Sequence, residues 1–174
     1  MKKWVLILGL CCFTINAFAG NERFVDEVTL GIGESKDHIG IYRIGAKKKF
    51  DKTFFDTDYG RLSGYYEASI NYWEKDSEEI YAIALSPVFV YYFGDRSNPI
   101  HPYIEGGIGA ACLSDTKIKR RNLSSHLNFE DRVGIGIRME SFDFNARYLH
   151  YSNAGIVEPN DGIDIFMFTL SYIF

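Results

Sequence analysis

Apolar and polar residues alternate with a period of two along most of the chain beyond its first 20 positions. The final segment shows this most clearly, because Phe166, Phe168, Leu170, Tyr172 and Phe174 occupy every second position. Successive side chains of a β-strand point to opposite faces, so the pattern predicts strands with one apolar face. The whole chain yields eight such strands, near 24–33, 38–47, 61–73, 79–93, 101–113, 129–139, 142–152 and 163–174.

These strands predict an all-β fold, an eight-stranded antiparallel transmembrane β-barrel of an outer membrane. Single-chain bacterial barrels have an even number of strands, and strands of about ten residues cross a bilayer when tilted. The chain is 16% aromatic and ends on Phe174, as expected for a barrel of this class. The segment 48–60 gives the weakest prediction, and it is expected to form a long turn with a little helix.

The first 19 residues predict a secretory signal peptide. Lys2 and Lys3 precede an apolar run, and Ala17-Phe18-Ala19 fits the small-x-small cleavage pattern. Residues 20–174 then form a single barrel domain. Without the two lysines the formal net charge falls from −4 to −6, so nucleic acid binding is not expected. Cys112 is the one cysteine after the signal peptide, which excludes an internal disulfide.

The inward parity of the strands is polar. Ser63, Glu67, Ser69 and Asn71 share one face of their strand, while apolar side chains hold the other. An eight-stranded barrel is filled by its own side chains, which disfavours a pore. The sequence therefore predicts a buried charge network, formed by Glu67, Glu105, Arg138 and Arg147.

Two polar residues interrupt the outward stripe of strand 142–152. Phe142, Phe144, Ala146 and Tyr148 are followed at the same parity by His150 and Ser152. The loops expected outside the cell are 34–37, 74–78, 114–128 and 153–162, so both residues lie near the outer-leaflet boundary. Polar side chains at a barrel rim commonly just meet headgroups and water, and that remains the alternative interpretation.

Hairpin symmetry gives these residues partners. A turn centred on Glu140-Ser141 places Asp131 opposite His150, and symmetric closure of 153–161 places Asp164 there from the other side. Directly opposed residues point to the same face, with Cβ atoms about 4.5–5.5 Å apart. Serine, histidine and an acid are the groups of a nucleophilic triad, in which the imidazole takes the hydroxyl proton. The register alone leaves both acids open.

The segment His150-Tyr151-Ser152-Asn153-Ala154-Gly155, followed by Pro159-Asn160-Asp161-Gly162-Ile163, resembles the signature of the lipid A 3-O-deacylase (PagL) family. Phe129-Glu130-Asp131-Arg132 resembles a second family segment. The resemblance implies an outer-membrane esterase that needs neither metal nor cofactor, with Ser152 as nucleophile, His150 as general base and Asp164 at the acid position. The family's acid is a glutamate, so Asp164 is one methylene shorter.

An esterase also needs donors for the oxyanion of its tetrahedral intermediate. The Asn153 side chain and the Gly155 backbone amide are the candidates, and Asn160 is expected to brace their loop. Asp131 is either a second acid or a structural residue. Basic residues in the third outer loop either are simply solvated or contact the phosphates of lipid A, for which guanidinium groups are well shaped: Lys117, Lys119, Arg120 and Arg121.

The expected function is hydrolysis of the acyl ester at position 3 of lipid A, with lipopolysaccharide and outer-membrane lipids as the partners. A monomer and a homodimer are both compatible with the sequence. Two other functions fit the fold: a structural or adhesive barrel without chemistry, and a lipid A palmitoyltransferase. The palmitoyltransferase would hold an acyl chain inside the barrel, which a charged interior disfavours.

Overall fold

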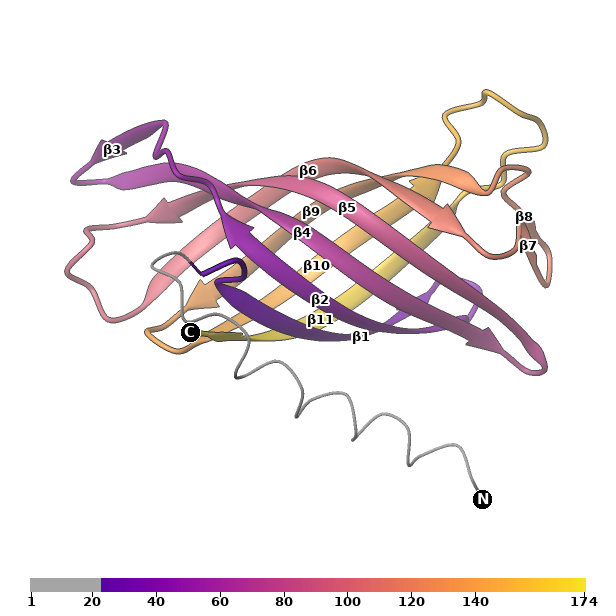
Figure 1. Ribbon diagram of the computed structural model, residues 1–174, viewed down its shortest axis with the longest axis horizontal. Helices are drawn as coiled ribbons and strands as arrows, with labels where there is room; N and C mark the ends of the chain where they lie inside the picture. The colour runs from indigo at the N-terminus through magenta and orange to yellow at the C-terminus, as the bar shows by residue number, and fades with distance from the viewer. Residues whose placement is uncertain (1–22) are drawn as a thin grey trace, which may run out of the picture.

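Eight long antiparallel strands close into a barrel in the computed structural model, which describes residues 23–174 (Figure 1). The signal peptide expected at 1–19 lies outside the described residues. Consecutive long strands are neighbours, including β2 and β4, and the pairing of the first strand β1 with the last strand β11 closes the ring. The long strands are β1 Glu27–Ser35, β2 Gly40–Lys49, β4 Gly60–Lys75, β5 Glu78–Phe93, β6 His101–Leu113, β9 Leu127–Arg138, β10 Phe142–Ser152 and β11 Ile163–Ile173.

The eight predicted strands are confirmed, with boundaries that differ by a few residues. The prediction of a little helix in 48–60 is wrong, because the segment contains a short strand instead. β3 (Phe55–Thr57) pairs with the start of β4. Aromatic packing holds this segment against the wall: the ring of Phe50 lies where a side chain on Gly64 would be, and Phe50 and Phe54 both contact Phe89.

The outer face of the barrel is an apolar belt. Exposed aliphatic and aromatic side chains cover every long strand, for example Ile32, Ile70, Ile83, Ile135 and Phe168. In water such a continuous apolar surface would be costly, whereas a bilayer covers it. The belt and the closed ring agree with the predicted outer-membrane class. Among residues 23–174, no helix is long and apolar enough to cross a membrane.

The two ends of the barrel carry different segments. The loop end carries the β10–β11 loop and the segment 114–126, which contains the small hairpin of β7 (Lys117–Ile118) and β8 (Arg121–Asn122). The opposite end carries β3 and the C-terminus (Figure 1).

The middle of the barrel is filled by buried ion pairs. Arg43 contacts Glu67 at 2.5 Å and Glu130 at 2.8 Å, and Arg147 contacts Glu67 at 3.2 Å and Glu105 at 3.3 Å. Arg132 also pairs with Glu67 and Glu130. Three arginines thus meet three glutamates, so the buried charges cancel. Pairing of this kind offsets the cost of removing charges from water.

The prediction that Arg138 joins this network is wrong. Its guanidinium contacts Glu27 at 2.6 Å and Asp143 at 3.5 Å, in a second cluster that also contains Lys47. The second cluster lies toward the opposite end, because Arg138 ends β9 and Asp143 begins β10. Inward parity is correct for Arg138, but position along the strand decides which partners it reaches.

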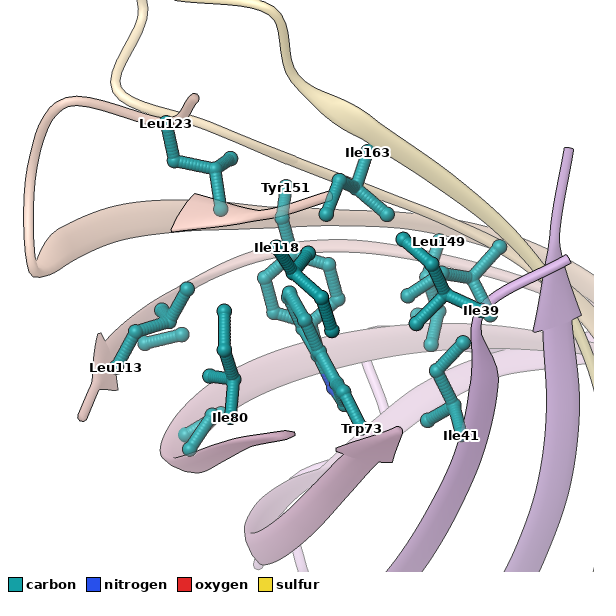
Figure 2. Packing of buried hydrophobic residues seen from close by; sticks show 14 of the residues in the cluster. Ile39, Ile41, Trp73, Ile80, Leu113, Ile118, Leu123, Leu149, Tyr151 and Ile163 are labelled. Atoms are coloured by element: carbon teal, nitrogen blue, oxygen red, sulfur yellow. The ribbon is translucent and has the colours of Figure 1, made fainter. Parts of the chain in front are cut away.

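The interior at the loop end is apolar, which the polar inward face does not predict. Buried apolar side chains fill this end of the barrel and form a cluster that we call the apolar plug (Figure 2). Within it, Trp73 and Tyr151 meet edge to face with ring centroids 4.9 Å apart. The plug fixes the strand ends where β10 meets its loop. Its members come from six long strands, the β1–β2 turn and the segment 114–126: Ile39, Ile41, Trp73, Ile80, Ala82, Ala84, Ala111, Leu113, Ile118, Leu123, Leu149, Tyr151, Ile163, Ile165 and Met167.

Candidate active site on the outer wall

The plug determines which side chains of β10 and β11 face outward. Leu149, Tyr151 and Ile163 are buried in the plug. Because side chains alternate along a strand, His150, Ser152 and Asp164 must project from the outer wall. Burying a large aliphatic side chain stabilises its position by about 1.5–3 kcal/mol, so a flip of β10 that would turn the site inward is strongly disfavoured.

His150 stands between two aspartates, as hairpin symmetry predicts. The register pairs it with Asp131 of β9 and with Asp164 of β11. Nδ1 of His150 lies 2.7 Å from Oδ1 of Asp164. Among residues 23–174, the Asp131 carboxylate makes no hydrogen bond or ion pair. Asp164 therefore reaches the imidazole despite its shorter side chain.

Gly162 leaves room for the other edge of the imidazole. A Cβ atom on Gly162 would lie 2.9 Å from Cε1 and 3.5 Å from Nε2 of His150. Gly162 follows the pair Tyr151–Ile163 in the register, so it lies across from Ser152. Cε1 and Nε2 of His150 therefore lie on the Gly162 side of the ring. Within residues 23–174 the Ser152 hydroxyl makes no hydrogen bond to the imidazole, so the structure joins His150 to Asp164 but not to Ser152.

Lys36 of the β1–β2 turn is a further neighbour of the acid. Its ammonium lies 2.9 Å from Oδ2 of Asp164, the oxygen that His150 does not use. The contact with Asp164 raises the pKa of Lys36, so the ammonium is charged at neutral pH. Sequence reasoning missed Lys36, because only the register of β1 against β11 brings the turn to Asp164.

The β10–β11 loop is bound to the segment 114–126. Asn153 is buried and donates both amide protons, to the carbonyls of Leu123 and Val157, each at 2.8 Å. Its side chain therefore has no N–H left for an oxyanion, contrary to expectation. Asn160 accepts a hydrogen bond from the Asn153 backbone at 3.2 Å, which is a bracing contact. The Gly155 backbone N–H makes no hydrogen bond within residues 23–174.

The four basic residues of the third loop differ in their contacts. Lys119 pairs with Asp76 at 3.1 Å and Glu78 at 3.4 Å, and the contact with Asp76 raises its pKa. Arg121 pairs with Asp37. Lys117 and Arg120 form no side-chain ion pair or hydrogen bond in the described part of the chain. Arg120 lines a hollow of about 620 Å³ between the loops, together with Lys36 and Lys75.

Comparison with known proteins gives consistent matches. The family model described as "Lipid A 3-O-deacylase (PagL)" matches residues 40–173. Lipid A deacylase PagL of Pseudomonas aeruginosa is 41% identical over 141 residues, which is 79% of this chain and 80% of that protein. Lipid A deacylase PagL of Bordetella bronchiseptica is 35% identical over 125 residues, 69% of this chain and 67% of that protein. The crystal structure of the outer membrane enzyme PagL superposes with a TM-score of 0.80 at 38% identity, covering 85% of this chain and 99% of that one.

Proposed function

Because the chain belongs to the lipid A 3-O-deacylase (PagL) family, we propose that it hydrolyses the acyl ester at position 3 of lipid A with Ser152, His150 and Asp164. The observation that carries the proposal is the row of these side chains on the outer wall, with His150 Nδ1 2.7 Å from Asp164. A site on this wall meets its substrate by lateral diffusion in the outer leaflet, so no pocket inside the barrel is required.

The proposed reaction has two halves. The Ser152 hydroxyl attacks the ester carbonyl while Nε2 of His150 takes its proton, and Asp164 stabilises the resulting imidazolium. The proton passes to the sugar oxygen as it leaves, and an acyl-enzyme remains. His150 then takes a proton from water, whose oxygen attacks the acyl carbon. The bond from that carbon to Ser152 Oγ breaks, His150 returns the proton to Oγ, and the fatty acid leaves.

The free Gly155 backbone N–H is the proposed donor to the oxyanion. Ala154 and Gly155 both adopt positive φ, 56° and 75°, in the turn directly after Ser152. Such consecutive backbone N–H groups form a concave site for a negatively charged oxygen. The bonded state of the Asn153 side chain favours Gly155 over Asn153 in this role.

Lys117 and Arg120 are the proposed contacts for the lipid A phosphates. They are the two basic residues of the loop without an acidic partner in the described part of the chain. Near an anionic surface each such residue contributes about 1 kcal/mol of attraction. Lys119 and Arg121 already pair with carboxylates, and these negative charges reduce their attraction for a phosphate.

No observation favours the two other functions. A palmitoyltransferase with its acyl chain in the barrel needs interior space, yet buried ion pairs and the apolar plug occupy the described interior. A barrel without catalytic activity does not explain why His150 and Asp164 are in contact on the outer wall.

Mass spectrometry of lipid A from cells that express the chain tests the proposal. We expect the loss of one 3-hydroxyacyl group, and unchanged lipid A when Ser152→Ala is present in the membrane at the same folded amount. A gain of palmitate would instead identify an acyltransferase, and unchanged lipid A with the wild-type barrel would identify a protein without this chemistry.

A further inference from the structure

His150, the proposed general base, is held in place by two features that lie outside its own strand, β10. One is the Asp164 carboxylate, which Lys36 holds by its second oxygen at 2.9 Å. The other is Gly162, which leaves the space that the imidazole ring occupies. The alignment of His150 therefore depends on the β1–β2 turn and on the last residues of the β10–β11 loop.

Arg121 contacts both of these segments with one guanidinium group. Its Nη1 donates to the carbonyl oxygens of Asp161 at 3.0 Å and Gly162 at 3.4 Å. Its Nε donates to the carboxylate of Asp37, the residue next to Lys36. This hydrogen bond lowers the pKa of Asp37, so the pair is ionised at neutral pH.

The small hairpin that carries Arg121 is itself fixed. Ile118 and Leu123 on either side of Arg121 are fully buried in the plug. Asn122, the next residue, donates its backbone N–H to the Asp161 carboxylate at 2.7 Å and accepts the Asp161 N–H at 3.1 Å. Arg121 thus reaches the two supports from a segment that is held by burial and by hydrogen bonds.

The side chain of the neighbouring Arg120 makes different contacts from that of Arg121. It has the same charge, but its side chain has no hydrogen bond or ion pair within residues 23–174. Arg121 is instead partly shielded, with 31% of its side chain exposed, and is engaged with one carboxylate and two carbonyls. Its geometry is that of a brace between loops.

We propose, on the basis of the proposed function, that Arg121 is a positioning residue for deacylation that keeps His150 and Asp164 aligned with Ser152. It acts through Gly162 on one side and through Asp37 and Lys36 on the other. The planar fork matters for this role, because a guanidinium holds several acceptors in fixed directions while an ammonium acts as a point charge. Arg121→Lys should therefore fail to replace it, although the charge is kept.

The test compares kcat and KM of purified barrels in detergent on phosphorylated lipid A. For Arg121→Lys we expect kcat to fall about 10-fold or more with KM little changed, since a small misplacement of reacting groups is costly. Arg120→Ala should raise KM and leave kcat near wild type. Arg96→Lys is the matched control: Arg96 also pairs with an aspartate, Asp56, at 2.5 Å, but at the opposite end of the barrel, and the change should leave both constants unaltered.

Rates normalised to the folded barrel separate positioning from simple loss of structure. A smaller folded fraction lowers the rate per total protein but leaves kcat per folded barrel unchanged. A misplaced His150 lowers kcat per folded barrel.

Asp37→Asn provides a second variant that cuts the same link without changing the hairpin, and it should reproduce the kcat loss even if Arg121→Lys folds poorly. Wild-type kcat in Arg121→Lys, with a raised KM in Arg121→Ala alone, would overturn the proposal and make Arg121 a charge contact. Inactivity of the wild-type barrel itself would instead be a failure of the proposed function.

Discussion

At the scale of the residue, Asp164 is characterised by how its two carboxylate oxygens are divided. Oδ1 lies 2.7 Å from Nδ1 of His150, and Oδ2 lies 2.9 Å from the Lys36 ammonium. A carboxylate held at both oxygens cannot rotate freely, which fixes the direction of the bond to the imidazole. Asp131 occupies the equivalent position on the other side of His150 but makes no such contact within the described chain.

This difference predicts unequal effects of the two acids. Asp164→Ala should lower kcat by about 10³-fold or more, though less than Ser152→Ala, because the orienting acid is often the least costly member of a triad to remove. Asp131→Ala should keep most activity. Asp164→Glu should retain activity, because it restores the residue that the family resemblance places here. Initial rates of the purified, folded variants show which aspartate orients His150. If Asp131→Ala is inactive while Asp164→Ala stays active, Asp131 is the orienting acid.

At the scale of the element, the β10–β11 hairpin could be predicted from sequence because strand parity and turn symmetry are local properties. Together they place His150 opposite both aspartates, and the strand register of the barrel contains the same two pairs. The loops could not be predicted in the same way. The β7–β8 hairpin has no alternation to identify it, and its contacts with Asp161 and Asp37 form only after the barrel closes. The sequence therefore does not reveal Lys36 and Arg121 as supports of the site.

Gly162 provides a prediction at this scale. It has a φ of 60°, and an added Cβ would lie 2.9 Å from the His150 ring. Gly162→Ala should therefore displace the imidazole and reduce kcat by about 10²-fold, the cost of a misplaced catalytic group. Gly94→Ala is the matched control, since Gly94 also has a positive φ, 83°, in a turn at the opposite end.

Both alanine variants incur a left-handed backbone cost of roughly 1–2 kcal/mol, so their unfolding midpoints should fall by similar amounts. Only Gly162→Ala should lose activity in the folded fraction. Equal kcat values for the two variants would show that the imidazole does not depend on the space above Gly162.

At the scale of the whole molecule, the barrel separates its stabilising groups from its reacting ones. Ion pairs and the apolar plug fill the inside, while the proposed chemistry takes place on the outer wall. Tyr151 connects the two, because it is buried between His150 and Ser152 and donates its hydroxyl to Glu130. The sequence prediction names Glu67, Glu105 and Arg147 as buried charges but leaves out Arg43, Glu130 and Arg132, although they share the inward parity of their strands. Which arginine meets which glutamate depends on how far the side chains reach across the closed ring.

The balance of three arginines and three glutamates predicts how the fold responds to loss of one charge. Glu67 contacts Arg43, Arg132 and Arg147, so Glu67→Gln leaves buried positive charge uncompensated. The free energy of unfolding in detergent should fall by about 3–5 kcal/mol. Glu34→Gln is the control, because the exposed Glu34 carboxylate forms a hydrogen bond with the His38 imidazole, a surface contact that is worth less than about 1 kcal/mol. Equal unfolding curves for the two variants would show that the buried ion pairs do not contribute the expected free energy of unfolding.

Hydrolysis of a lipid A acyl ester by Ser152 on the outer wall is tested most directly by the release of fatty acid in ¹⁸O-labelled water. Purified wild-type barrel and folded Ser152→Ala are each incubated with lipid A, and the free acids are analysed by mass spectrometry. The wild type should release a single 3-hydroxy fatty acid with one ¹⁸O atom in its carboxylate, and Ser152→Ala should release none. Equal release by the two proteins, or none from the wild type, would contradict the assignment of Ser152 as the nucleophile of a lipid A deacylase.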